Sequence, residues 1–136
     1  MYNNILVPIV FDHDPSAEQA LEVAHTLLAE GGKISLLHVV EDIPAYASTL
    51  VPEDVWNNTT VSAAKDLKAL AASNAKGADT AVITGHPSRA ILDHGDEIGA
   101  DCIVISSHKP GLEDYFLGST AARVVRHAKC AVHILR

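Results

Sequence analysis

Residues suited to bind an anion lie in the last quarter of the chain. The sequence Ser-Ser-His-Lys at 106–109 follows an apolar run, and Gly-Ser-Thr at 118–120 opens a segment with helical spacing. The first N–H groups of a helix have no partner within the helix and carry a partial positive charge, so a glycine followed by hydroxylated residues lets a phosphate approach the backbone. The pattern predicts an anion-binding site whose expected ligand is a nucleotide.

Each of these residues also fits an ordinary structural role. Ser119 is a common residue at the start of any helix, and Lys109 beside Pro110 also fits a solvated loop. Gly118 and Lys109 favour the binding interpretation, because a glycine at a helix start and a basic side chain in an acidic protein are what an anion site needs. A side chain at position 118 is expected to obstruct the phosphate and to meet an unfavourable backbone angle.

Composition narrows the classes of function. The chain has 136 residues, 48% of them hydrophobic and 4% aromatic, which fits one domain whose buried parallel strands are covered by helices. Seventeen acidic residues against ten basic ones give a net charge of −7, and such a surface repels nucleic acid and anionic lipid. We expect no nucleic-acid partner, no membrane insertion and a cytoplasmic location, since no apolar stretch reaches signal or transmembrane length.

Strands and helices are predicted to alternate along the chain. Short apolar runs predict strands, and apolar residues at i, i+3, i+4 and i+7 predict amphipathic helices. The expected strands cover residues 5–10, 34–40, 80–84, 102–105 and 131–135, and the expected helices cover 17–30 (with a stop at Gly31 and Gly32), 61–75, 88–98 and 119–127. Residues 41–58 are expected to form a long irregular connection. The order βαβαβαβαβ predicts a single-domain, Rossmann-like α/β fold with a parallel sheet and helices on both faces.

Ligands of such sheets bind beyond the carboxyl ends of the strands, where the winding reverses. Three segments are expected to meet there, namely residues 8–14, 38–42 and 106–120. Two histidines in these segments, His38 and His108, are candidates for hydrogen bonds to a nucleotide or to its loop.

Several familiar motifs are absent from the sequence. The chain lacks G-x-x-x-x-G-K-[ST], which excludes a P-loop ATPase, and it lacks G-x-S-x-G, which excludes an α/β-hydrolase. It also lacks G-x-G-x-x-G after the first strand, which disfavours a dinucleotide-binding domain. A phospho-receiver needs an aspartate at the end of the third strand, where this chain has Ile-Thr-Gly at 83–85. The eight histidines and two cysteines show no metal-ligand spacing, so no metal site is expected, and Cys102 and Cys130 are expected to be buried, reduced thiols.

Three separated parts of the sequence resemble the universal stress protein family. They are Ile-Leu-Val-Pro at 5–8, Leu-His-Val at 37–39 with Gly-His-Pro at 85–87, and the run from Ser106 to the last strand. Within the family, residues 106–110, 115–119 and 124–130 are most similar to the F and G subgroup. The resemblance covers nearly the whole chain. It implies a five-stranded sheet of order 3-2-1-4-5, the adenine nucleotide alpha hydrolase-like fold, and a homodimer through the last strand or a higher oligomer.

The chain departs from the nucleotide motif of that family at two places. ATP-binding members carry G-x2-G-x9-G-[ST] between the fourth strand and the last helix. Here Ser106 and Lys109 stand at the first two glycine positions, eight residues separate Lys109 from Gly118, and Gly118 with Ser119 keeps the third element. The Pro-x-Asp of the first strand is Pro-Ile-Val at 8–10 in this chain.

The resemblance implies that the ligand is ATP or a related adenine nucleotide, ADP or AMP, with or without magnesium. It implies adenine against residues 8–10 and Val39, ribose near Ser106, and phosphates on Lys109 and the start of the last helix. The candidate nucleotide-binding residues are Pro8, Ile9, Val10, Val39, Ser106, His108, Lys109, Gly118, Ser119 and Thr120. No catalytic residue and no metal ligand are among them.

The expected role is that of a stress-response sensor or regulator rather than an efficient enzyme, because the sequence offers no general base beside the phosphates. Two alternatives stay open at this point. One is a slow nucleotide hydrolase that uses His108 or Asp12. The other is a nucleotide-free interaction module of the same fold, which the replaced glycines and the missing Pro-x-Asp carboxylate favour.

Overall fold

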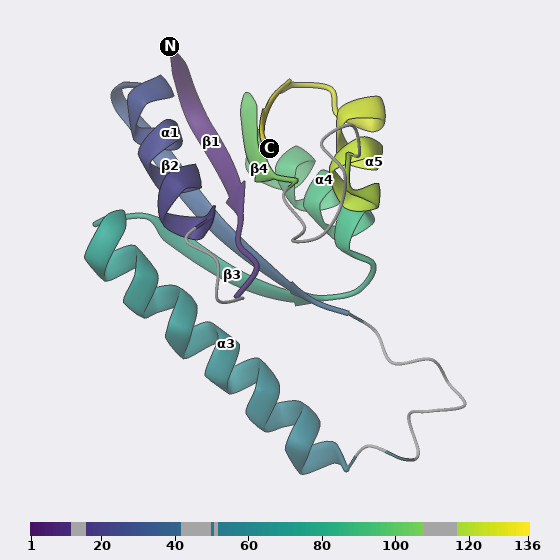
Figure 1. Ribbon diagram of the computed structural model, residues 1–136. Coiled ribbons are helices and arrows are strands. Elements are labelled where there is room, and N and C mark those ends of the chain that lie inside the picture. Colours follow the sequence, from purple (N-terminus) through teal and green to yellow (C-terminus); the bar gives the residue numbers. More distant parts are fainter. Residues whose placement is uncertain (12–15, 42–49, 51, 108–116) are drawn as a thin grey trace.

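A five-stranded parallel sheet forms the centre of the fold (Figure 1). The computed structural model describes residues 1–11, 16–41, 50, 52–107 and 117–136. The elements are β1 (Tyr2–Pro8), α1 (Ser16–Leu27), β2 (Leu28–Val40), α3 (Glu53–Asn74), β3 (Asp79–Thr84), α4 (Pro87–Ile98), β4 (Cys102–Ser106), α5 (Ser119–His127) and β5 (Ala131–Leu135). The strand order is β3-β2-β1-β4-β5 and every neighbouring pair is parallel, which confirms the order 3-2-1-4-5.

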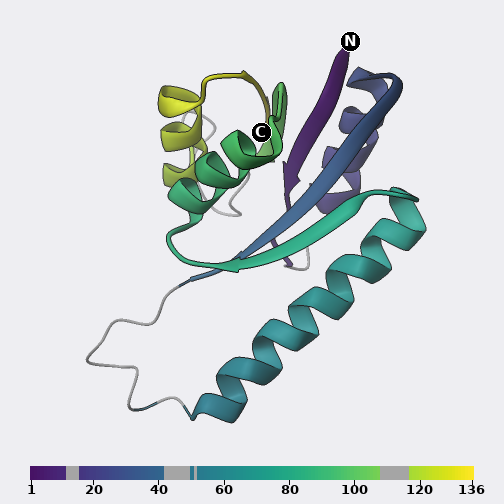
Figure 2. The same ribbon diagram turned by 180° about the vertical axis from the view of Figure 1, so that it is seen from behind.

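Helices cover both faces of the sheet, and each face has its own core (Figure 2). On one face α1 and α3 pack over Ile5, with Leu67 of α3 fully buried there. On the other face α4 and α5 pack over Leu6 through Ile91 and Val124. Because successive side chains of a strand point to opposite faces, the apolar run of β1 supplies both cores. The prediction of helices on both faces is confirmed.

The join between α1 and β2 differs from the prediction. The sequence predicts a helix stop at Gly31 and Gly32, but α1 ends at Leu27 and β2 begins at Leu28. The two glycines lie in an irregularity of the β1–β2 register, between the pairs that Tyr2 and Asn4 make. Gly31 has a φ of 76°, and a Cβ on Gly32 would lie 2.7 Å from Leu28 Cδ1. The glycines therefore serve a bulge in the sheet rather than a helix end.

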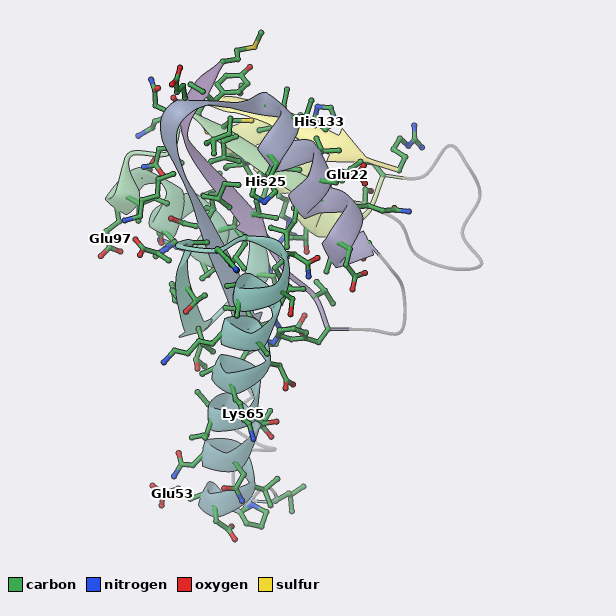
Figure 3. The ribbon with its side chains drawn as sticks, turned by 90° about the vertical axis from the view of Figure 1, so that its left-hand side faces the viewer. Glu22, His25, Glu53, Lys65, Glu97 and His133 are labelled. Carbon is green, nitrogen blue, oxygen red and sulfur yellow. The ribbon has the colours of Figure 1, made fainter. Side chains whose placement is uncertain are left out.

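α3 begins earlier than the sequence predicts. Residues 53–58, assigned above to an irregular connection, form the first turns of this helix. Glu53 and Asp54 lie in the first turn, where acidic side chains interact favourably with the helix dipole. Figure 3 shows Glu53 at the far end of the helix, away from the sheet. The side chains of residues 53–55 and 57–58 are exposed, so this end of the helix has no buried stripe that would indicate it in the sequence.

A hydrogen bond joins the C-terminal end of α3 to α1. His25 Nε2–H donates to the carbonyl oxygen of Asn74 over 2.7 Å, and Figure 3 shows His25 between the two helices. A histidine that donates to one of the last carbonyls of a helix satisfies a group that has no partner within the helix. This bond and the burial of Leu67 hold the C-terminal half of α3 on the sheet.

Both cysteines are free thiols. Cys102 is buried and Cys130 is half-buried, so the expectation of burial holds fully only for Cys102. Burial raises the pKa of the Cys102 thiol to about 11, with smaller contributions from Cys130 and Asp101, and burial also raises the pKa of Cys130. Both side chains are protonated at neutral pH and therefore weakly nucleophilic.

The packing of α3 gives a prediction about stability. Leu67→Ala should lower the free energy of unfolding by about 2 to 5 kcal/mol, because it leaves a cavity between α3 and the sheet. Val61→Ala on the same helix is the matched control, and since Val61 is 67% exposed it should change the free energy by less than about 0.5 kcal/mol. Urea denaturation followed by circular dichroism measures both. Equal effects at the two positions would contradict this packing of α3.

Candidate functional site

A cavity of about 370 Å³ lies at the carboxyl ends of the central strands. β1 pairs with β2 on one side and with β4 on the other, and the helices that follow β1 and β4 pack on opposite faces. This is the point at which the winding of the sheet reverses and at which such sheets bind ligands. The cavity is lined by the ends of β1, β2 and β4 and by the starts of α1, α4 and α5.

Most of the residues singled out in the sequence line this one cavity. They are Pro8, Ile9, Val10, Val39, Ser106, Gly118, Ser119 and Thr120, and the earlier candidate His38 lines it as well. His108 and Lys109 lie outside the described residues. The three separated segments therefore meet at one sheet edge, as the alternating pattern predicts.

The start of α5 lines the cavity with backbone N–H groups that have no partner within the helix. Gly118 occupies the N-cap position, so Ser119 is the first helical residue and not the cap. The first N–H to bond within the helix is that of Ala122, which donates to the Gly118 carbonyl over 2.9 Å. The N–H groups of Ser119, Thr120 and Ala121 are left without a helical partner, and all three residues line the cavity.

Two further helices begin at the same cavity. α1 starts at Ser16 and α4 at Pro87, and both residues belong to the lining. Three helix N-termini around one cavity create a local positive potential in a protein whose net charge is −7. No motif in the sequence indicated this contribution of α1 and α4. The alternation of strands and helices could have indicated it, because α1 and α4 each follow a strand whose carboxyl end lies at this edge of the sheet.

Ser107 is a site residue that the sequence motifs did not single out. It is 9% exposed, and its N–H donates to the carbonyl oxygen of Leu135 over 2.7 Å. Its Oγ accepts the N–H of Gly118 over 2.9 Å. One residue thus joins the end of β4 to the end of β5 and to the start of α5. Its position beside Ser106 was the only signal for it in the sequence.

The conformation of Gly118 does not require glycine. Its φ is −55° and its ψ is 150°, a region that any residue adopts. A Cβ at this position would lie 3.6 Å from Ser107 Oγ and 3.8 Å from Ser107 O, which are ordinary van der Waals distances. The expectation of an unfavourable backbone angle at position 118 is therefore wrong.

His38 supports the end of β1. Its Nδ1–H donates to the carbonyl oxygen of Ile9 over 2.8 Å, and its ring lies 5.0 Å from that of Phe11. The N–H of Ile9 donates to the carbonyl oxygen of Leu37 over 2.7 Å. Both backbone groups of Ile9 are thus engaged, whereas the next residue, Val10, is 66% exposed. In the neutral ring, His38 Nε2 is left as a hydrogen-bond acceptor.

A larger and more open hollow of about 660 Å³ lies beside β3, between Lys68 of α3 and His94 of α4. No helix in the described part of the chain begins at this hollow. Its described lining therefore lacks the helix N-terminal N–H groups that line the smaller cavity. The described ranges also contain no group of three His, Cys, Asp or Glu side chains that could hold a metal ion. In those same ranges no helix has the length and apolar character needed to cross a membrane.

Comparison with known proteins gives one consistent result. Residues 1–136 match the model of the universal stress protein family. Universal stress protein G of Salmonella typhimurium is 31% identical over 155 aligned positions that cover 100% of both chains. Universal stress protein UspA from Lactobacillus plantarum is 25% identical, with a TM-score of 0.74 over 99% of this chain and 98% of its own.

Two solved structures with the same fold contain a nucleotide. A universal stress protein in complex with cAMP has a TM-score of 0.67 and 21% identity, over 99% of this chain and 97% of its own. The universal stress protein from Archaeoglobus fulgidus in complex with dAMP has a TM-score of 0.58 and 22% identity, over 99% and 98%. At these identities the likeness establishes a shared fold.

The geometry of Gly118 gives the second prediction. Gly118→Ala should keep the free energy of unfolding within about 1 kcal/mol of the wild type, because the new methyl group fits and the backbone angle suits alanine. The matched control is Gly99→Ala at the end of α4, where φ is 69° and alanine should cost about 1 to 2 kcal/mol. Thermal and urea denaturation compare the two. A loss at position 118 as large as that at position 99 would contradict the described backbone.

Proposed function

This chain belongs to the universal stress protein family, and we propose that it binds an adenine nucleotide in the cavity between β1 and β4 and acts as a cytoplasmic stress-response sensor or regulator. The observation that carries the proposal is the start of α5, where three N–H groups without a partner in the helix line the cavity. Such groups bind phosphate without a dedicated basic side chain. The volume of about 370 Å³ falls within the range of about 300 to 1,000 Å³ typical of small-molecule sites.

The nucleotide complexes of the two relatives support the ligand class. cAMP and dAMP share an adenine base and a phosphate. In the proposed mode of binding the base lies against Val10 and Val39, the ribose lies near Ser106, and the phosphate meets the N–H groups of residues 119–121. Because both backbone groups of Ile9 are already bonded, the backbone of Val10 is the better candidate to read the edge of the base.

We propose ATP as the preferred nucleotide because Lys109 would add a positive charge for the outer phosphates. The described residues supply no metal cluster. We propose that magnesium arrives with the phosphates, since Mg²⁺ is commonly held by phosphate oxygens and few protein ligands.

The proposed role is binding without efficient hydrolysis. The titratable side chains among the described lining residues are His38 and Glu41, at the end of β2 and just after it. Neither residue lies on β4 or α5, where the phosphates are proposed to bind, and a general base must come within about 3 Å of its proton. A slow hydrolase would have to rely on His108 or Asp12, which lie outside the described residues.

Titration calorimetry with adenosine, AMP, ADP and ATP tests the proposed function, with GTP as the control for the base. We expect saturable binding of the adenine compounds and weaker binding of GTP. The ligand retained by the protein from its expression host is identified by mass after acid denaturation. If no adenine compound binds and none is retained, the proposal fails and the nucleotide-free interaction module takes its place.

The third prediction concerns the outer phosphates. Lys109→Ala should weaken ATP binding about ten- to hundredfold through the loss of a charge-assisted hydrogen bond of about 1.5 to 3 kcal/mol. The affinities for AMP and adenosine should hardly change. Lys129→Ala is the matched control, since Lys129 is an exposed lysine outside the cavity. An equal change for all four ligands, or none, would show that Lys109 does not bind the terminal phosphates.

The fourth prediction concerns assembly, for which we propose a homodimer through β5. β5 is an edge strand of the sheet, and edge strands offer unpaired backbone groups to a second copy. Val132 and Ile134 pack against the core under α5, so the sharper variant replaces the exposed Ala131 and His133 by Glu. Like charges facing each other across the two strands should yield monomers in light scattering. Thr84→Glu on the other edge strand is the control and should remain a dimer. A dimer that survives the β5 change would place the interface elsewhere.

A further inference from the structure

We infer that Ser107 is a positioning residue that determines which N–H groups of α5 receive the phosphate, an inference that rests on the proposed function. Ser107 is 9% exposed and lies between the last residue of β4 and the segment 108–117. Its own N–H is fixed by the carbonyl oxygen of Leu135, so the residue continues the sheet one step beyond β4. Its Oγ then reaches the N-cap residue of α5.

The hydrogen bond from Gly118 to Ser107 Oγ assigns the first N–H of this region to the protein. The resemblance assigns Gly118 to the phosphates, but its N–H is already donated over 2.9 Å to a buried acceptor. The next three N–H groups, those of Ser119, Thr120 and Ala121, are the ones without a helical partner. The phosphate site therefore begins at Ser119 and includes Ala121, which the sequence motif does not contain.

The same bond determines where α5 begins relative to the sheet. Ala121 and Val124 of α5 are buried in the core on this face of the sheet. Leu117, just before the helix, packs against the same core. These apolar contacts are non-directional, so they do not by themselves set how the first N–H groups of α5 point. Ser107 Oγ adds a directional contact at the N-cap itself. The carbonyl oxygen of Leu135, at the end of β5, holds the N–H of Ser107. The first N–H groups of α5 therefore keep one orientation toward the cavity.

A role in positioning differs from a merely structural role in its effect on ligands. Loss of the acceptor leaves the Gly118 N–H unpaired and lets the start of α5 shift, which weakens contacts to the phosphate. The proposed base contacts on β1 and β2 do not involve Ser107. A structural defect alone would instead weaken adenosine and AMP binding together, by reducing the folded fraction.

The binding test compares AMP with adenosine in three variants. Ser107→Ala should weaken AMP binding about tenfold while the adenosine affinity stays the same. Ser107→Thr keeps the hydroxyl and should restore most of the AMP affinity. Ser35→Ala is the matched control, since Ser35 is a second buried serine that lies outside this cavity. An AMP-to-adenosine affinity ratio unchanged by Ser107→Ala would overturn the inference.

A second measurement does not depend on any ligand. Labelling with ¹⁵N-glycine gives one amide signal for each of the eight glycines. The Gly118 signal should show slow hydrogen exchange in the wild type, faster exchange in Ser107→Ala and slow exchange in Ser107→Thr. If Ser107→Ala leaves the exchange of the Gly118 amide unchanged, the inference about Ser107 fails and the proposed function still stands. If the wild type binds neither AMP nor adenosine, both the proposed function and this inference fail.

Discussion

Parallel pairing on both sides of β1 is the constraint from which the rest of the structure follows. The core of β1 is fully buried, so helices must cover it on both faces. Right-handed crossovers then lead the chain one way through β2 and β3 and the other way through β4 and β5. The helices after β1 and β4 separate to opposite faces and leave a cavity beyond the strand ends.

The helix starts around this cavity reconcile the proposed anion binding with an acidic protein. A net charge of −7 would disfavour an approaching phosphate at long range. Partial charges on the first turns of α1, α4 and α5 act within a few ångströms, and they face a partly enclosed cavity where solvent screens them less. Among the described residues of the lining the acidic one is Glu41, which lies just after the end of β2.

The proposed anion site relies on a helix start more than on a glycine-rich loop. Serine and lysine replace two of the three motif glycines, and the third, Gly118, has a backbone conformation open to any residue. What remains at position 118 is an N–H that Ser107 uses and a carbonyl that begins α5. The replaced glycines that favoured a nucleotide-free module therefore remove less of the site than the motif comparison suggests, because backbone N–H groups are present whatever the side chain.

The sequence by itself determined the order of the elements, the parallel sheet and the edge at which the segments around Pro8, Val39 and Ser119 meet. These features follow from apolar periodicity, which is local, and from the handedness of crossovers, which holds for nearly all such sheets. Element boundaries depended on distant partners: the pairing of β2 with Tyr2 and Asn4 turns Gly31 into part of a bulge. Only the tertiary structure decided that Ser107 bonds Gly118 and Leu135 and that His38 bonds Ile9. Such bonds join single polar groups far apart in the chain, and a hydroxyl or imidazole leaves no periodic pattern that would reveal its partner before the strands are in register.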